Sequence, residues 1–206
     1  MTTKILDKST PQPEHEQRFV RHGLTWQQFK AIQASFEDVP GVRLSYLDGT
    51  LELMTIREPH EVVSTILGVL LALYFAEIGI NVYGTGSVTL EAEERGASVE
   101  PDLSYYVGGT EGKDYPDLAI EVVYTSGNIK KLEKYKRFGV TEVWFWEDEQ
   151  LFLYRLHEHE YEQIPQSDFF PDLNLALLVR CTLIHLREKN MTQAMTKFIN
   201  EIRVNN

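Results

Sequence analysis

The chain has little of three features that define large classes of protein. Its 206 residues include a single cysteine, Cys181, which excludes a disulfide scaffold and a Cys-rich zinc module and favours a reduced, cytoplasmic setting. Its longest stretch without a charged residue, residues 62–76, is shorter than the roughly 20 residues of a membrane-spanning helix. Bases are also scarce, with 20 Lys and Arg against 31 Asp and Glu. We therefore expect no membrane partner and no binding of nucleic acid by bulk positive charge.

The sequence does contain enough apolar material for a folded core. Hydrophobic residues make up 43% of the chain, including 10 Tyr, 10 Phe and 3 Trp, and these values are typical of a globular protein. Residues 1–20 are predicted to form a flexible N-terminal tail, because they begin with a polar stretch that carries Pro11 and Pro13 and lacks the apolar region of a secretory signal. Residues 21–206 are predicted to form one domain.

Hydrophobic periodicity and turn residues predict the order of helices and strands. Thr25 is a suitable N-cap for the first helix, and Asp48-Gly49 suits the tight turn of a hairpin. The uncharged stretch predicts a buried helix that ends before Gly79. The order predicts an α/β fold in which a mixed β-sheet is flanked by helices. In chain order, we expect a helix over 26–36, strands over 42–47 and 51–55, a helix that begins near Pro59, strands over 81–83, 87–92, 99–107 and 118–124, a helix over 128–138, strands over 142–146, 151–156 and 161–164, and two helical segments near the C-terminus.

Charge changes sign between two neighbouring parts of the chain. Residues 91–121 hold nine acids and two bases, whereas residues 128–138 hold five bases and one acid. An acidic pair of strands therefore precedes a basic helix. Most of the bases are expected on the solvated face of that helix, from which they could contact DNA phosphates. These residues are Lys130, Lys134, Lys136 and Arg137.

Two of the acids fall where the predicted strands are otherwise apolar. Alternation places Glu121 in the middle of its strand, on the face that it shares with Asp117. Asp102 follows Pro101 at the corresponding point of the preceding strand. Because an unpaired buried carboxylate is costly, each of the two acids needs a partner. Carboxylates on neighbouring strands form the oxygen-rich site that Mg²⁺ or Mn²⁺ prefers, and a purely structural pair bridged to a base is the alternative.

The basic helix supplies the base that such a site needs. Leu132, Tyr135 and Phe138 define its apolar face. Lys131 lies within about 40° of the centre of that face, so it is the lysine that points inward. We expect it either to neutralise the two carboxylates or to hold a water nucleophile and stabilise developing negative charge.

Four motifs follow one another here: Pro101-Asp102, Glu121-Val122-Val123, Lys131-Leu132-Glu133-Lys134-Tyr135 and Gly139-Val140-Thr141-Glu142-Val143-Trp144. Together they resemble the restriction endonuclease family of bacterial proteins that is assigned to the PD-(D/E)XK nuclease superfamily. The resemblance extends over residues 25–173 and so covers most of the chain.

The resemblance implies a restriction-endonuclease-like core and metal-dependent hydrolysis of DNA phosphodiesters. Asp102 and Glu121 would bind Mg²⁺ or Mn²⁺, and a lysine would assist the attacking water. The superfamily's usual lysine position, two residues after the Glu, is Val123 in this sequence. We therefore expect Lys131 to replace it, which makes Asp102, Glu121 and Lys131 the catalytic residues of an endodeoxyribonuclease.

Four further residues are secondary candidates for the same site. Glu61 and Glu52 could reach the carboxylates from the start of the buried helix and from the hairpin. His60 could bind metal or cap the helix, and Asp117 could join the site or cap its own strand. Two other functions stay open. An inactive nuclease fold could bind nucleic acid or protein, and the same carboxylates would serve a hydrolase of other phosphate esters.

The C-terminal part of the sequence is consistent with a homodimer. Trp144 and Trp146 alternate on a strand that is either core or dimer surface. Ala194, Phe198 and Ile202 recur at helical spacing and would give an apolar face for a second copy of the chain.

Overall fold

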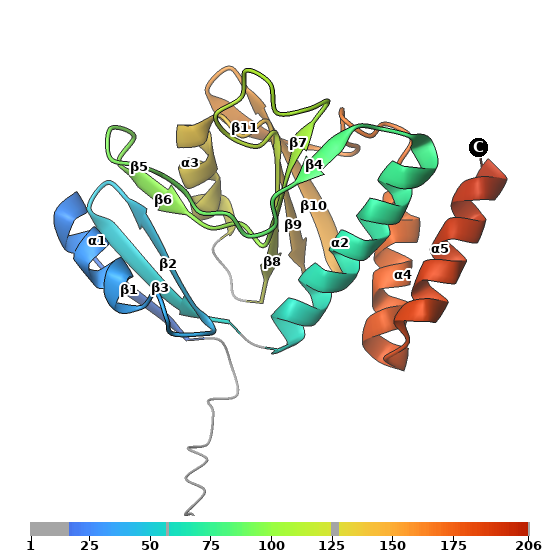
Figure 1. The fold of residues 1–206 in the computed structure, drawn as a ribbon, viewed down its shortest axis with the longest axis horizontal. Helices are drawn as coiled ribbons and strands as arrows, with labels where there is room; N and C mark the ends of the chain where they lie inside the picture. The colour runs from blue at the N-terminus through green and yellow to red at the C-terminus, as the bar shows by residue number, and fades with distance from the viewer. Residues whose placement is uncertain (1–16, 57, 125–127, 206) are drawn as a thin grey trace, which may run out of the picture.

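Two β-sheets with a helix between them form one part of the molecule, and three further helices pack beyond the second sheet (Figure 1). The computed structural model describes residues 17–56, 58–124 and 128–205, so most of the predicted tail lies outside the described residues. At its end, Arg18–Arg21 forms strand β1, because it pairs with β3 of the first sheet. The α/β class is confirmed, with two sheets in place of the one that we expected.

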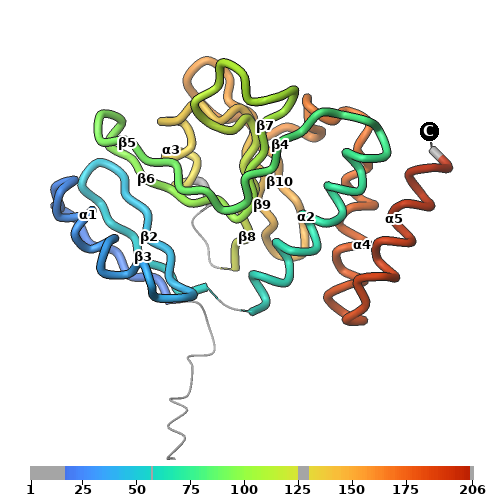
Figure 2. The backbone as a smooth tube through the Cα atoms, viewed as in Figure 1, coloured from blue at the N-terminus to red at the C-terminus, as the bar shows by residue number. Residues whose placement is uncertain are grey.

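The first sheet, called sheet 1, has five strands in the order β1-β3-β2-β6-β5, and every neighbouring pair is antiparallel. The predicted hairpin is confirmed as β2 and β3, since Asp48 and Gly49 adopt the positive φ values, 44° and 84°, that a tight two-residue turn requires. Figure 2 shows the distant β5–β6 segment beside this hairpin. The remaining bounds are β2 Val42–Leu47, β3 Thr50–Thr55, β5 Leu90–Ala92 and β6 Ala97–Val99.

Helix α1, Trp26–Ser35, covers the outer face of sheet 1 (Figure 1). Its N-cap is the predicted Thr25, whose side chain accepts a hydrogen bond from a backbone N–H in the first turn. The ring of Phe29 stacks on Tyr46 of β2, with centroids 4.9 Å apart. Because Tyr46 faces α1, the alternation of the strand turns Arg43 to the other side of sheet 1, where it meets Asp102.

The second sheet, called sheet 2, has six strands in the order β11-β10-β9-β8-β7-β4 and is mixed because β8 and β9 run parallel. Every residue of β8, Leu118–Val123, is buried. Ala119, Glu121 and Val123 face helix α3, Asn128–Phe138, as alternation predicts, and the other side chains of β8 face α2. The other strands are β4 Val82–Gly84, β7 Leu103–Val107, β9 Glu142–Glu147, β10 Gln150–His157 and β11 Glu160–Ile164.

Helix α2, Glu58–Ile78, is the buried helix that the uncharged stretch predicted. In the described part of the chain it is the one helix whose length and composition would allow it to cross a membrane. In this fold α2 lies between β8 and the C-terminal helices (Figure 1), and its Val63 and Leu70 are fully buried. These are α4, Leu175–Glu188, and α5, Met191–Asn205. The helix therefore forms the centre of the larger hydrophobic core.

The apolar residues that suggested a dimer surface belong to this core. Ala194, Phe198 and Ile202 of α5 are buried together with α2 and α4. Trp144 and Trp146 of β9 lie in the same cluster, so the alternative that they are core residues is confirmed. Helical spacing identified a buried face correctly, but another part of the same chain covers it.

The strand expected over residues 99–107 is two strands in different sheets. β6 ends two residues before Pro101 in sheet 1, and β7 begins at Leu103 in sheet 2. Pro101 has no N–H and cannot continue the ladder. Asp102 therefore lies where the chain crosses between the sheets, and its backbone N–H donates to the carbonyl of Ile120 on β8 at 3.1 Å. The prediction that Asp102 lies within a strand is wrong, but it does lie beside β8.

Candidate active site

Asp102 is a buried carboxylate with a partner on each oxygen. Its side chain is fully buried. The backbone N–H of Val122 donates to Oδ2 at 2.6 Å, and Nη1 of Arg43 donates to Oδ1. The first contact fixes Asp102 against β8, next to Glu121, and the second supplies the positive charge that a buried carboxylate needs.

Glu121 lies at the centre of β8 and is also held by two donors. Lys131 Nζ donates to Oε2 at 2.9 Å, and the hydroxyl of Tyr135 donates to Oε1 at 2.5 Å. Both donors belong to α3. They are four residues apart and therefore lie on the same face of that helix. Burial and the neighbouring Glu121 raise the pKa of Tyr135 well above its ordinary value, so the phenol keeps its proton and remains a donor.

The inward orientation predicted for Lys131 is confirmed by this contact. Tyr135 also belongs to this site by its contact with Glu121, whereas the sequence pattern placed its ring only on the apolar face of the helix. The signal was a hydroxyl-bearing side chain four residues after Lys131, on the face that meets a buried acid.

Arg43 of β2 is a second missed residue, and it contacts three acids. Nη1 pairs with Asp102, Nε lies 3.3 Å from Glu100, and Nη2 lies 3.9 Å from Glu61. Its side chain is only 15% exposed. An arginine that alternates with the buried Leu44 and Tyr46 was the available signal, but no local pattern shows which acids it meets.

Glu100 is the third missed residue, and it stands at the edge of the same site. Its side chain is 28% exposed. Burial raises the pKa of Glu100; Arg43 opposes that effect, while Glu121 and Glu61 add to it. Glu100 and Glu61 both contact Arg43, so several carboxylates lie near one another here. Glu61, a predicted secondary candidate, belongs to this group, with 57% of its side chain exposed.

His60, in the first turn of α2, is fully buried and so does not lie on the surface. Its Nε2 lies 3.2 Å from Asp102 Oδ2. Burial, with a further contribution from Arg43, lowers the pKa of His60 to about 4. The ring is therefore neutral at pH 7, and the charge of Asp102 is balanced by Arg43 rather than by the histidine.

Lys134 is not on the solvated helix face that was expected. Its side chain is buried, and Nζ lies 2.6 Å from Ser45 Oγ and 3.1 Å from Glu52 Oε2. Burial lowers the pKa of Lys134, and Glu52 opposes that shift. Burial also acts to raise the pKa of Glu52, but Lys134 and Arg18 outweigh it and the pKa is lowered. Sheet 1 covers this side of α3, which a helical wheel cannot show.

The other bases of α3 differ in their surroundings. Lys130 is exposed. Lys136 pairs with Glu133 at 2.9 Å, and Arg137 pairs with Asp48 at 2.5 Å. The basic helix is therefore largely neutralised by acids of its own and of neighbouring elements, and its charge is not concentrated on one open surface.

Asp117 has a structural role, which was one of its predicted alternatives. Its Oδ2 accepts hydrogen bonds from Lys113 Nζ at 2.6 Å and from the backbone N–H of Val107 at 2.7 Å. These contacts tie the start of β8 to the end of β7. Asp117 therefore makes its contacts at the start of β8, whereas Asp102 contacts Val122 near the end of that strand.

A small cavity of about 20 Å³ is lined by residues of β2, β3, β8 and α3. That volume is enough for about one water molecule. Both acids and bases line it, so that it offers both hard oxygen atoms and positive charge. Its polar lining consists of Arg43, Ser45, Glu52, Glu100, Glu121, Lys131 and Lys134.

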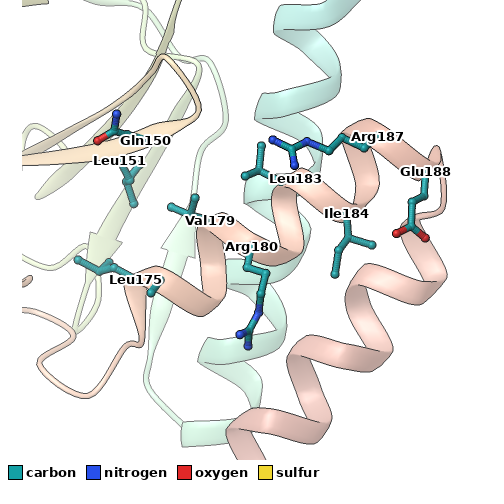
Figure 3. A pocket seen from close by; sticks show the side chains of 10 residues that line it. Gln150, Leu151, Leu175, Val179, Arg180, Leu183, Ile184, Arg187 and Glu188 are labelled. Carbon is teal, nitrogen blue, oxygen red and sulfur yellow. The ribbon is translucent and has the colours of Figure 1, made fainter.

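A larger groove of about 550 Å³ lies away from this site, between the start of β10 and helix α4 (Figure 3). Leu151, Val179 and Leu183 give it an apolar floor. Its charged side chains include Arg187, which pairs with Glu149 at 2.6 Å. The groove brings no acid pair or nucleophile together, so it does not compete with the carboxylate site as a catalytic centre.

Comparison with protein families agrees with the resemblance seen in the sequence. The chain is similar to a solved structure from Anabaena variabilis described as a putative nuclease belonging to DUF820, with a TM-score of 0.49 and 14% identity over 80% of this chain and 97% of that one. No curated protein matches the chain. Residues 26–184 match the Uma2 family, described as "putative restriction endonuclease". Since this match spans most of the sequence, the chain belongs to that family.

Proposed function

We propose that this protein is a divalent-metal-dependent endonuclease that hydrolyses DNA phosphodiester bonds. The observation that carries the proposal is the pair of buried carboxylates, Asp102 and Glu121, with Lys131 Nζ 2.9 Å from the second. A buried acid pair with an inward lysine is an expensive arrangement to keep for stability alone. Membership of the restriction endonuclease family supports the same chemistry.

The side chains of the site fit Mg²⁺ or Mn²⁺ by their chemistry. Both cations prefer carboxylate oxygens, and Mg²⁺ is commonly held by one or two carboxylates while water and substrate phosphate complete its shell. Two carboxylates are therefore sufficient. Within the described residues no group of three His, Cys, Asp or Glu side chains is arranged to hold a metal ion, so the proposal relies on two carboxylates, with water and substrate phosphate as the remaining ligands.

The chain's own residues divide the catalytic work. Asp102 and Glu121 would hold the ion, which when bound polarises the phosphate and lowers the pKa of a water molecule. Lys131 borders the cavity, so its charge can orient a water and stabilise the negative charge that develops on the phosphate. Tyr135 restrains Glu121, which keeps the carboxylate in one orientation.

A second candidate function is a nuclease fold that binds nucleic acid or protein without cleaving it. Two observations favour it. Val123 stands at the superfamily's usual lysine position, and the carboxylate of Asp102 already forms an ion pair with Arg43. The two candidates differ in whether phosphodiester bonds are broken when metal is present.

The test is to incubate the full chain with supercoiled DNA, branched DNA, RNA and a small phosphodiester, each with and without Mg²⁺ or Mn²⁺. The proposal predicts metal-dependent cleavage of DNA that is lost in Glu121→Ala and strongly reduced in Lys131→Ala. Lys113→Ala is the matched control, because Lys113 also pairs with a carboxylate but lies away from the site. Cleavage of RNA or of the small phosphodiester, without cleavage of DNA, would show that this class of compound is the substrate in place of DNA. Binding of DNA without cleavage would favour the second candidate.

A further inference from the structure

The guanidinium of Arg43 stands where several carboxylates of the site converge. Three of its nitrogens face three different acids: Nη1 faces Asp102, Nε lies 3.3 Å from Glu100 and Nη2 lies 3.9 Å from Glu61. A side chain with a fixed planar fork and a permanent charge is well suited to hold such a group. Arg43 is the cation around which these acids are arranged.

Asp102 depends on this cation more than its neighbours do. The Asp102 side chain is fully buried, whereas those of Glu100 and Glu61 are partly exposed and gain from contact with water. The Asp102 carboxylate is therefore held by the guanidinium of Arg43 and by the backbone N–H of Val122.

The same contacts restrict what a metal ion can reach. Oδ2 of Asp102 is turned toward the Val122 N–H at 2.6 Å, and Oδ1 is paired with Arg43. A divalent cation that approached Oδ1 would meet the charge of Arg43 at close range, where two positive charges repel strongly. The ion and the guanidinium thus compete for one oxygen atom.

We propose that Arg43 is a positioning residue that holds Asp102 while the site is free of metal, and that a divalent cation binds by displacing its guanidinium from Asp102 Oδ1. This inference rests on the proposed function, because it needs Asp102 to be a metal ligand. The contacts with Glu100 and Glu61 then retain the displaced guanidinium beside the site. Metal affinity is consequently weaker than two carboxylates alone would give.

The experiment measures the binding of Mn²⁺ alone to the full chain by water-proton relaxation, without nucleic acid. Arg43→Gln removes the competing charge and is expected to bind Mn²⁺ about tenfold more tightly, as when one charge-assisted hydrogen bond no longer has to be broken. Arg155→Gln is the matched control, since Arg155 is partly buried and pairs with the buried Glu142 at 3.4 Å away from the site. Its Mn²⁺ affinity is expected to equal that of the wild type.

Two further variants keep the result interpretable. Arg43→Lys retains the charge but loses the planar fork, so its affinity should lie between those of the wild type and Arg43→Gln, and circular dichroism of each variant checks that it is folded. Asp102→Asn should abolish binding in every background. Equal or weaker binding by Arg43→Gln, with binding still lost in Asp102→Asn, overturns the role of Arg43 and leaves the metal site standing. No binding by any folded variant, or binding that survives Asp102→Asn, overturns both this inference and the proposed metal dependence.

Discussion

Replacing Tyr135 by phenylalanine removes one of the two side-chain donors that hold Glu121. The ring is fully buried and stays in place, so the change leaves almost no cavity. What is lost is a hydrogen bond of 2.5 Å from the phenol to a buried carboxylate oxygen. Hydrogen bonds to charged groups contribute roughly 1.5–3 kcal/mol. We therefore expect Tyr135→Phe to lower the free energy of unfolding by about 2 kcal/mol at pH 7.

The assay is equilibrium unfolding in urea, with a chelator present so that metal does not contribute. Tyr106→Phe is the matched control, because the Tyr106 hydroxyl makes only a long contact of 3.4 Å with an exposed carbonyl, and it should cost less than about 0.5 kcal/mol. A double-mutant cycle with Glu121→Gln should give a coupling energy of about 1–2 kcal/mol. A loss no larger than that of the control, or no coupling, would refute the account of how Glu121 is held.

Three other predictions follow from the same contacts. Glu142→Ala should lower the free energy of unfolding by about 3–5 kcal/mol. The buried Glu142 accepts hydrogen bonds from Trp144 Nε1 at 2.9 Å and Ser167 Oγ at 2.8 Å, and it also pairs with Arg155. Thermal melting measures the loss, and Glu160→Ala, at an exposed position, is the control. The pKa of Glu52 is lowered because its two basic partners outweigh burial, so the stability it contributes is complete above its ordinary pKa of 4.5 and is lost as the pH falls through its folded value. Acid titration of unfolding should therefore show a smaller loss in Glu52→Gln than in the wild type. In fluorescence anisotropy with duplex DNA, Lys130→Ala should weaken binding and reduce the salt slope by about 1, and an unchanged slope would exclude Lys130 from the DNA contact.

The central residues of the site could be predicted because each depends on a local pattern. Strand alternation placed Glu121 on the face that it shares with Asp117, and helical spacing turned Lys131 inward; the structure shows that these two side chains meet. The turn at Asp48-Gly49 and the cap at Thr25 are likewise determined by neighbouring residues. In each case the controlling interaction spans only a few positions of the chain.

The parts that could not be predicted depend on contacts between distant segments. Arg43 meets Asp102 across 59 positions and Lys134 meets Ser45 across 89, and both contacts exist because sheet 1 packs over α3 and the crossing at Pro101. The hydrophobic periodicity of each segment does not predict how the two segments pack against each other. The same reason applies in part to the apolar face of α5, which resembled a dimer surface: besides the adjacent α4 it packs against α2, which lies more than 100 positions earlier in the chain.

The most direct test of the central claim separates DNA binding from chemistry in one reaction. The full chain is first mixed with supercoiled DNA in the presence of EDTA, and excess Mg²⁺ is then added while nicked circles are counted over time. We predict that nicking begins only after Mg²⁺ is added and is absent in Glu121→Gln, which keeps the volume of the side chain but not its charge. Nicking at the same rate by both proteins, or none by the folded wild type, would contradict the assignment of Asp102 and Glu121 as a metal-dependent nuclease site.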